Sequence, residues 1–296
     1  MISRRCEKRR FLLRPDSYVT QVFLYLLAYA ARESNILIHG FVSMSNHFHL
    51  VLTDLDGVLP MFMEQFDGLL ARVLNAYRGR WESFFAPGSY SMVRLATAED
   101  RLAKLVYILV NPVAAGLVDH ARRWTGATSI RWRFGETRAL ARPGGSFFRP
   151  ASQLPEKVGL MLSPLPGFEQ RASGELDELV RQRVIERETE LRAEHQAQGK
   201  SYLGMDGVPR CDPEDSPETR EPRRRLNPRV AGAEAEVRMG LLGEWTTFTR
   251  LYRRAWLQWR AGDHAAVFPD GTWLMRVRHG AACSSSALAA HPPPPS

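Results

Sequence analysis

Two histidines one residue apart, His47 and His49, are the side chains of this sequence best placed for metal chemistry. They begin an apolar run, 47–52, that favours a β-strand, and side chains alternate between the two faces of a strand. The two histidines then share one face, with Cα atoms about 6.6 Å apart, while Phe48 and Leu50 turn toward a core. Two imidazoles on one face can bind a single divalent metal ion. The same pattern also fits two polar residues on a solvated sheet face.

A second group of polar side chains lies on a helix expected between Thr97 and Asn111. Thr97 and Asp100 have the spacing of a capping box, and Pro112 disfavours helical conformation in the residue before it. At 3.6 residues per turn, the face opposite the leucines carries Asp100, Lys104, Tyr107 and Asn111. Tyr107 and Asn111 are four positions apart and are therefore neighbours. They could be a nucleophile and a metal ligand, or a tyrosine at the core rim and an asparagine that ends the helix.

Together the two motifs resemble those of the HUH single-tyrosine transposases, and most closely those of the REP-associated tyrosine transposases. Residues 40–49 contain the family's histidine, hydrophobic residue and histidine, and residues 105–118 contain a tyrosine four positions before an asparagine. Between them, the aromatic-rich segment 78–87 is similar to the family segment that precedes the tyrosine helix. The resemblance is specific over residues 1–134 and continues loosely to residues 268–276.

The resemblance implies a DNA-cleaving and rejoining enzyme that acts on single-stranded DNA beside palindromic hairpins. Tyr107 would be the nucleophile that forms a 5′-phosphotyrosine, and His47, His49 and Asn111 would hold a divalent metal ion. Imidazole and amide ligands suit Mg2+ or Mn2+ in a nuclease, although histidines would also accept zinc. The basic residues expected to contact DNA are Arg4, Arg5, Lys8, Arg9, Arg10 and Lys104.

Strands and helices mix without regular βαβ repetition, which predicts an α+β fold. Strands are expected within 2–14 and over 35–44, 48–53 and 94–95, and helices over about 16–33 and 59–79. The resemblance implies a ferredoxin-like antiparallel sheet with helices on one face. It assigns residues 1–134 to the catalytic domain.

A mainly helical C-terminal extension is expected over residues 135–283. It should contain a charged helix at 175–197, a Pro-rich linker near 211–229 and a helix near 243–261. The aromatic stripe of this last helix favours a docking face over a base-stacking platform. The tail, 284–296, is expected to be disordered.

Composition agrees with a folded protein that binds a polyanion. The chain has 296 residues and a net charge of +8, from 40 Lys and Arg against 32 Asp and Glu. Basic charge favours association with nucleic acid, although it also simply aids solubility. The three cysteines are far apart and form no CxxC, which argues against a zinc knuckle or a disulfide framework. Without a long apolar run or a signal-peptide core, the protein is expected to be cytoplasmic. It is expected to act as a monomer or homodimer.

Two other functions remain open at this point. One is a domesticated hairpin-binding protein that has lost cleavage, although the complete set of motif residues argues against it. The other is a metal-dependent phosphodiesterase in which water, rather than Tyr107, attacks phosphorus.

Overall fold

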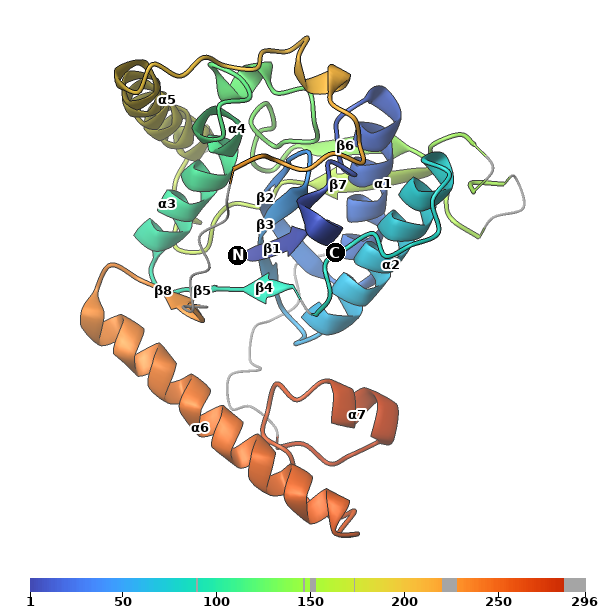
Figure 1. The fold of residues 1–296 in the computed structure, drawn as a ribbon. Coiled ribbons are helices and arrows are strands. Elements are labelled where there is room, and N and C mark those ends of the chain that lie inside the picture. The colour runs from blue at the N-terminus through green and yellow to red at the C-terminus, as the bar shows by residue number, and fades with distance from the viewer. Residues whose placement is uncertain (89, 146, 150–152, 173, 220–227, 285–296) are drawn as a thin grey trace.

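A four-stranded antiparallel sheet forms the centre of the protein. The computed structural model describes residues 1–88, 90–145, 147–149, 153–172, 174–219 and 228–284 (Figure 1). The strands of the sheet, β1 (Ile2–Arg5), β2 (Ile36–Ser43), β3 (His47–Asp54) and β4 (Ser91–Met92), lie in the order β2-β3-β1-β4. Strands β2 and β3 form an antiparallel hairpin joined by the short turn of Met44, Ser45 and Asn46. The predicted α+β class is confirmed.

One face of the sheet is covered by α1 (Ser17–Glu33) and α2 (Leu59–Tyr77). Asp16 caps α1 by accepting a hydrogen bond from the Val19 amide (2.7 Å). Phe48 of β3 contacts aromatic rings from both helices, including Phe23 of α1 and Phe66 of α2, and all three are fully buried. These aromatic contacts form the larger of the two cores that flank the sheet.

The opposite face of the sheet is covered by α3 (Ala98–Leu109), and α4 (Asn111–Ala114) and α5 (Glu175–Ala197) pack against α3 in the core on that side. Helices therefore lie on both faces rather than on the single face expected. The physical reason is that β2 and β3 are apolar on both sides: Leu50 points to the α1 side, whereas Val42 and Val51 are buried against α3. The expected capping box of α3 is present between Thr97 and Asp100.

Residues after 134 complete both cores, so the expected domain boundary does not separate two packing units. Strands β6 (Thr137–Ala141) and β7 (Lys157–Met161) form an antiparallel pair beside α1, and Val158 and Leu160 are buried in the core on that side. Val180 of α5 is buried in the core on the α3 side. Short 3-10 turns connect these elements at Glu7–Arg9, Ala121–Arg123 and Val208–Arg210.

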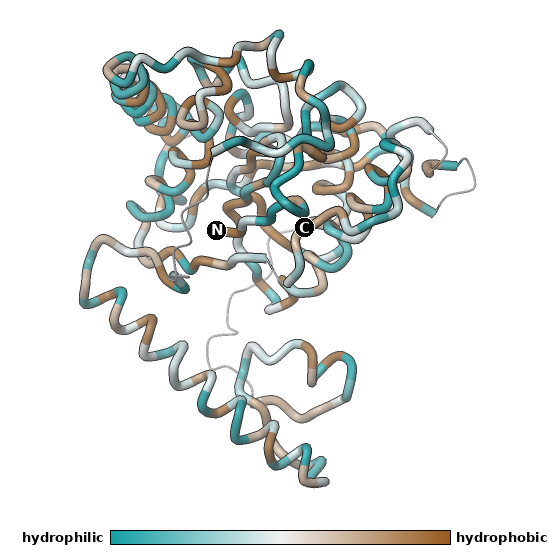
Figure 2. Tube along the Cα trace, viewed as in Figure 1, coloured by the Kyte–Doolittle hydropathy of each residue, from teal (hydrophilic) through white to brown (hydrophobic). Residues whose placement is uncertain are grey.

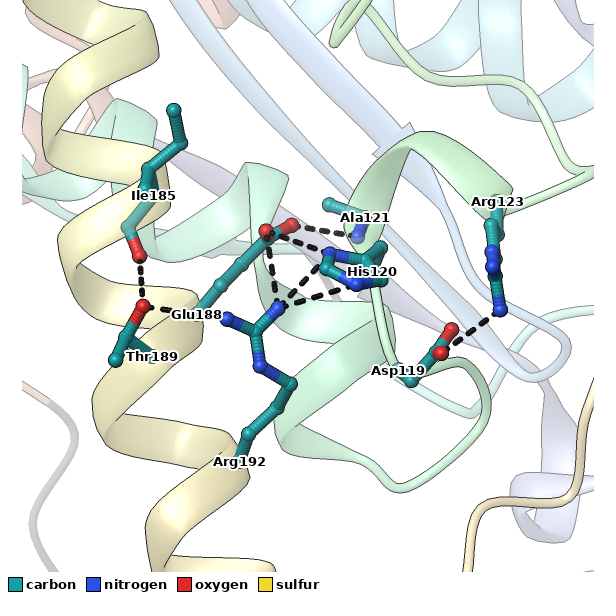
Figure 3. Close-up of polar contacts among 8 residues, drawn as sticks. All are labelled: Asp119, His120, Ala121, Arg123, Ile185, Glu188, Thr189 and Arg192. Carbon is teal, nitrogen blue, oxygen red and sulfur yellow. Dashed lines mark hydrogen bonds and ion pairs between the residues drawn. The ribbon is translucent and has the colours of Figure 1, made fainter.

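A buried carboxylate anchors α5 to the rest of the protein (Figure 3). Glu188 is 6% exposed, and one carboxylate oxygen accepts a hydrogen bond of 2.6 Å from the Ala121 amide. Its other oxygen lies 3.4 Å from His120 Nδ1, and Arg192 contacts the same imidazole. The outer side of α5 instead carries Arg–Glu pairs, as expected of a solvated face.

The C-terminal part contains β8 (Val230–Ala231), α6 (Ala235–Arg260) and α7 (Leu274–His279). Strand β8 pairs in parallel with β5 (Arg94–Leu95), and α6 then extends away from the sheet (Figure 1). Helix α6 begins earlier than the expected residue 243. Part of its aromatic stripe is a docking face, since Tyr252 and Trp259 pack on Phe268, whereas Trp245 and Trp256 are exposed.

Hydrophilic and hydrophobic residues alternate along α6, in contrast to the largely hydrophobic strands of the central sheet (Figure 2). Residues 211–219 of the expected linker pack on the N-terminal turn. Residues 220–227, and the tail after Ser284, lie outside the described residues. Among the helices that the structure describes, none has the length and apolar character needed to cross a membrane.

Candidate active site

The two histidines of β3 point to the same face of the sheet, as their spacing predicts. Their ring centroids are 4.8 Å apart, with the rings nearly perpendicular. Strand pairing places Ser3 of β1 opposite His49 and Arg5 opposite His47. The Ser3 hydroxyl lies 2.6 Å from His49 Nδ1, so it orients this ring.

A hydrogen-bond chain also fixes the orientation of the His47 ring. Asn46 donates through Nδ2 to the Arg9 carbonyl (3.2 Å), and this bond turns its Oδ1 toward His47 Nδ1, 2.7 Å away. Because an amide oxygen can only accept, His47 carries its proton on Nδ1. Its Nε2 then has a free lone pair, which is the form that binds metals.

Both imidazoles are neutral at physiological pH. Burial lowers the pKa of His47 to about 4, with smaller contributions from the positive charges of Arg5 and Arg9. Burial also lowers the pKa of His49 to about 3, and the neighbouring His47 and Arg5 act in the same direction. Metal binding requires neutral histidine, so the protein environment prepares this pair for a cation.

Tyr107 of α3 lies beside this pair. Its ring centroid is 6.0 Å from that of His49, and the two rings meet edge to face. The side chain is 47% exposed, so its hydroxyl can be reached from solvent. The Lys104 ammonium, one turn earlier on α3, lies 5.3 Å from the Tyr107 ring centroid. The fold therefore brings together three of the predicted site residues, His47, His49 and Tyr107, with Lys104 next to the tyrosine.

Asn111 lies at the boundary between α3 and α4. Helix α3 ends at Leu109, Val110 caps it, and Asn111 begins α4. Asn111 is half-buried, and its side chain forms no hydrogen bond within the described part of the chain. Asn111 follows Tyr107 by four residues, as expected, and the hydrogen bonds of the histidines in the described part of the chain go to Ser3 and Asn46 instead.

Apart from Lys104, the predicted DNA-binding residues fall into three groups. Arg4 points away from the histidines, because it alternates with Ser3 and Arg5 along β1, and its Nε forms a mostly buried ion pair with Asp67 (3.0 Å). Arg5 lies beside His47. The 3-10 turn Glu7–Arg9 and the following Arg10 contact residues 214–219. The Ser216 hydroxyl donates to the Lys8 carbonyl, the Arg9 guanidinium donates to Thr219, and Arg10 forms an ion pair with Glu214.

A groove of about 440 Å³ separates α3 from α5 on one side of Tyr107. Its floor is apolar and includes Leu102 and Val106. Four carboxylates and two guanidinium groups line it, so it is acidic: Glu99, Asp100, Glu186, Glu190, Arg183 and Arg187. Lys104 and the histidines lie outside this groove.

Sequence reasoning missed Ser3 and Asn46, which orient the two imidazoles. Asn46 directly precedes His47 and could have been noticed from the sequence, whereas Ser3 is recognised only through the β1–β3 register. Within the described residues, no three His, Cys, Asp or Glu side chains are grouped so as to hold a metal ion. A third protein ligand would therefore have to be of another type, such as the Asn111 amide.

Comparisons of the chain with protein-family models, with curated proteins and with solved structures found no match. The resemblance to HUH transposases thus rests on the motif residues of the sequence.

Proposed function

We propose that this protein is a transposase-like single-stranded DNA endonuclease and strand transferase with a tyrosine nucleophile and a divalent metal ion. The observation that carries the proposal is the position of Tyr107, whose ring lies 6.0 Å from that of His49. A half-exposed tyrosine beside a half-buried His47 and a buried His49, both neutral, supports the roles that the resemblance to the HUH single-tyrosine transposases implies.

The donor set fits a divalent cation. Ser3 and Asn46 engage the Nδ1 atoms of His49 and His47, which leaves the Nε2 atoms for a ligand. Asn111 is the candidate for the third ligand, and Mg2+ or Mn2+ is the expected ion. When bound, such an ion would polarise the scissile phosphate and stabilise the developing negative charge.

The proposed reaction exchanges one phosphoester for another. The Tyr107 Oη forms a bond to phosphorus as the bond from phosphorus to the 3′ oxygen breaks. Tyr107 loses its proton and the leaving 3′ oxygen gains one, so the step is balanced. The phosphotyrosine conserves the energy of the broken phosphodiester bond. A second 3′ hydroxyl can therefore attack it, release Tyr107 and join two strands without ATP.

The charges around Tyr107 suggest on which side the strand lies. The groove toward α5 is acidic and would repel phosphates. Lys104 and Arg5, by contrast, supply positive charge near Tyr107 and His47. We therefore place the DNA strand along the β1 side of the tyrosine, with Lys104 as a phosphate contact. Arg4 is removed from the proposed set because Asp67 holds it.

A denaturing gel tests this function directly. Labelled single-stranded hairpin DNA incubated with protein and Mn2+ should give a shifted, protease-sensitive band. Tyr107→Phe should abolish this band, while the matched control Tyr77→Phe, at a similarly exposed tyrosine, should keep it. An adduct that persists in Tyr107→Phe would refute the nucleophile. Cleavage without any adduct would indicate a water-dependent phosphodiesterase, and binding without cleavage a hairpin-binding protein.

A further inference from the structure

Helix α6 carries arginines that lack acidic partners. Between Glu244 and Asp263 the sequence contains four arginines and no Asp or Glu. These arginines, Arg250, Arg253, Arg254 and Arg260, are exposed, and none forms an ion pair within the described part of the chain. On the other long charged helix, α5, arginines such as Arg181 and Arg187 each pair with a glutamate. A solvated face usually mixes both signs of charge, and the part of α6 after Glu244 does not.

The arginines lie away from the side of α6 that packs on the protein. Tyr252, Ala255 and Trp259 recur at helical spacing and contact the segment around Phe268. At 100° per residue, Arg250, Arg253 and Arg254 fall on the other side of the helix. Residues 250–260 span about 15 Å. We call the four exposed arginines the α6 arginine face.

The start of α6 is fixed beside the tyrosine helix. Strand β8, just before α6, pairs with β5, which leads into α3. The Ala233 amide donates to Asp100 at the first turn of α3 (2.9 Å), and Arg94 pairs with Glu244 (2.7 Å). A ligand on α6 would therefore be held at a defined position relative to Tyr107.

We infer that the α6 arginine face binds the phosphate backbone of a DNA duplex, the paired stem next to the cleaved strand. Guanidinium groups match phosphate geometry, and a row of unpaired cations suits a polyanion. The inference rests on the proposed function for the choice of DNA. Of the aromatic rings near the arginines, those of Tyr252 and Trp259 are packed against Phe268, and Arg260 lies over the partly exposed ring of Trp256. This favours a duplex backbone over an unpaired strand, which needs open rings for base stacking.

The test is the salt dependence of hairpin binding by the full chain, followed by fluorescence anisotropy. In Arg250→Gln/Arg253→Gln/Arg254→Gln, the slope of log Kd against log salt should fall by about 2 to 3, because each lost phosphate contact accounts for about 0.9. The control Arg123→Gln/Arg138→Gln/Arg181→Gln removes the same charge from arginines paired with carboxylates and should leave the slope unchanged. The variant with three lysines on α6 keeps the charge and should retain most of the slope, which checks that substitution does not disrupt the helix.

The outcomes separate this inference from the proposed function. The inference about α6 would be overturned if both glutamine variants changed the salt slope equally, or if neither changed it. A second result would also overturn the inference. If the glutamine variant of α6 lost binding to phosphatidylserine vesicles but kept its binding to DNA, the arginine face would bind a membrane surface instead. All binding measurements can be made in Tyr107→Phe, so a missing covalent adduct refutes the proposed chemistry without affecting the result for α6.

Discussion

Gly40 of β2 leaves the space that the side chain of Leu105 fills. A Cβ atom on Gly40 would lie 2.2 Å from Leu105 Cδ1, which is far closer than atoms in contact. Gly40 also adjoins the bulge that shifts the β2–β3 register between Ile38 and Gly40. Through this contact α3 approaches the sheet closely enough to bring Tyr107 to His49.

Gly40→Ala is expected to move α3 outward. Because the clashing Leu105 side chain is itself buried, the added methyl group should cost about 1–3 kcal/mol of unfolding free energy, measured by urea denaturation. The proposed adduct should form more slowly as well. Gly68→Ala, on α2 where a Cβ meets nothing within 4 Å, should be neutral or slightly stabilising. Equal stability of the two variants would show that the close approach is unimportant.

His47→Ala and His49→Ala should each abolish cleavage with added Mg2+ or Mn2+, while hairpin binding stays within about threefold. The reason is that the rings share one face and both are neutral. Isothermal calorimetry with Mn2+ alone gives a separate readout, and Ser3→Ala should weaken metal binding about 10- to 100-fold. Full cleavage by the double alanine variant would exclude the histidines as ligands.

The histidine pair should make folding stability depend on pH. In the native state the pKa values are about 4 for His47 and about 3 for His49, below the ordinary 6.5. The unfolded chain therefore binds more protons, and stability should fall as the pH drops from about 6.5 to 4. In His47→Gln/His49→Gln this fall should be smaller, as measured by urea denaturation across that range. Identical pH profiles would contradict the low pKa values.

Glu188→Ala should destabilise the protein by about 1–3 kcal/mol, because the buried Ala121 amide loses its acceptor. The exposed Glu190 pairs with Arg187 in water, and Glu190→Ala should change stability by less than about 0.5 kcal/mol. Urea denaturation of both variants measures the difference. A similar small effect at both positions would mean that Glu188 does not anchor α5.

A fragment of residues 1–140 is expected to lack a cooperative unfolding transition, because it removes Leu160 from one core and Val180 from the other. A fragment of residues 1–219 keeps both cores and should fold, as judged by circular dichroism and thermal melting. Every predicted catalytic residue precedes Pro112, so this fragment should still form the adduct. A folded 1–219 fragment that binds hairpin DNA without cleaving it would place a catalytic group further along the chain.

The sequence alone determined the local structure and the residue types of the candidate site. Periodicity and short-range hydrogen bonding were enough to predict three features: helix α3 with its capping box, the β2–β3 hairpin, and the shared face of His47 and His49. The charged helix α5 was also predictable, since its boundaries depend on residues within the helix itself.

Tertiary structure decided everything that depends on contacts between distant residues. The β1–β3 register placed Ser3 and Arg5 at the histidines and turned Arg4 toward Asp67. Packing of α5 into the second core moved the effective domain boundary past residue 134. Neither follows from local patterns, because apolar periodicity tells which side of an element is buried and does not tell which other element covers it.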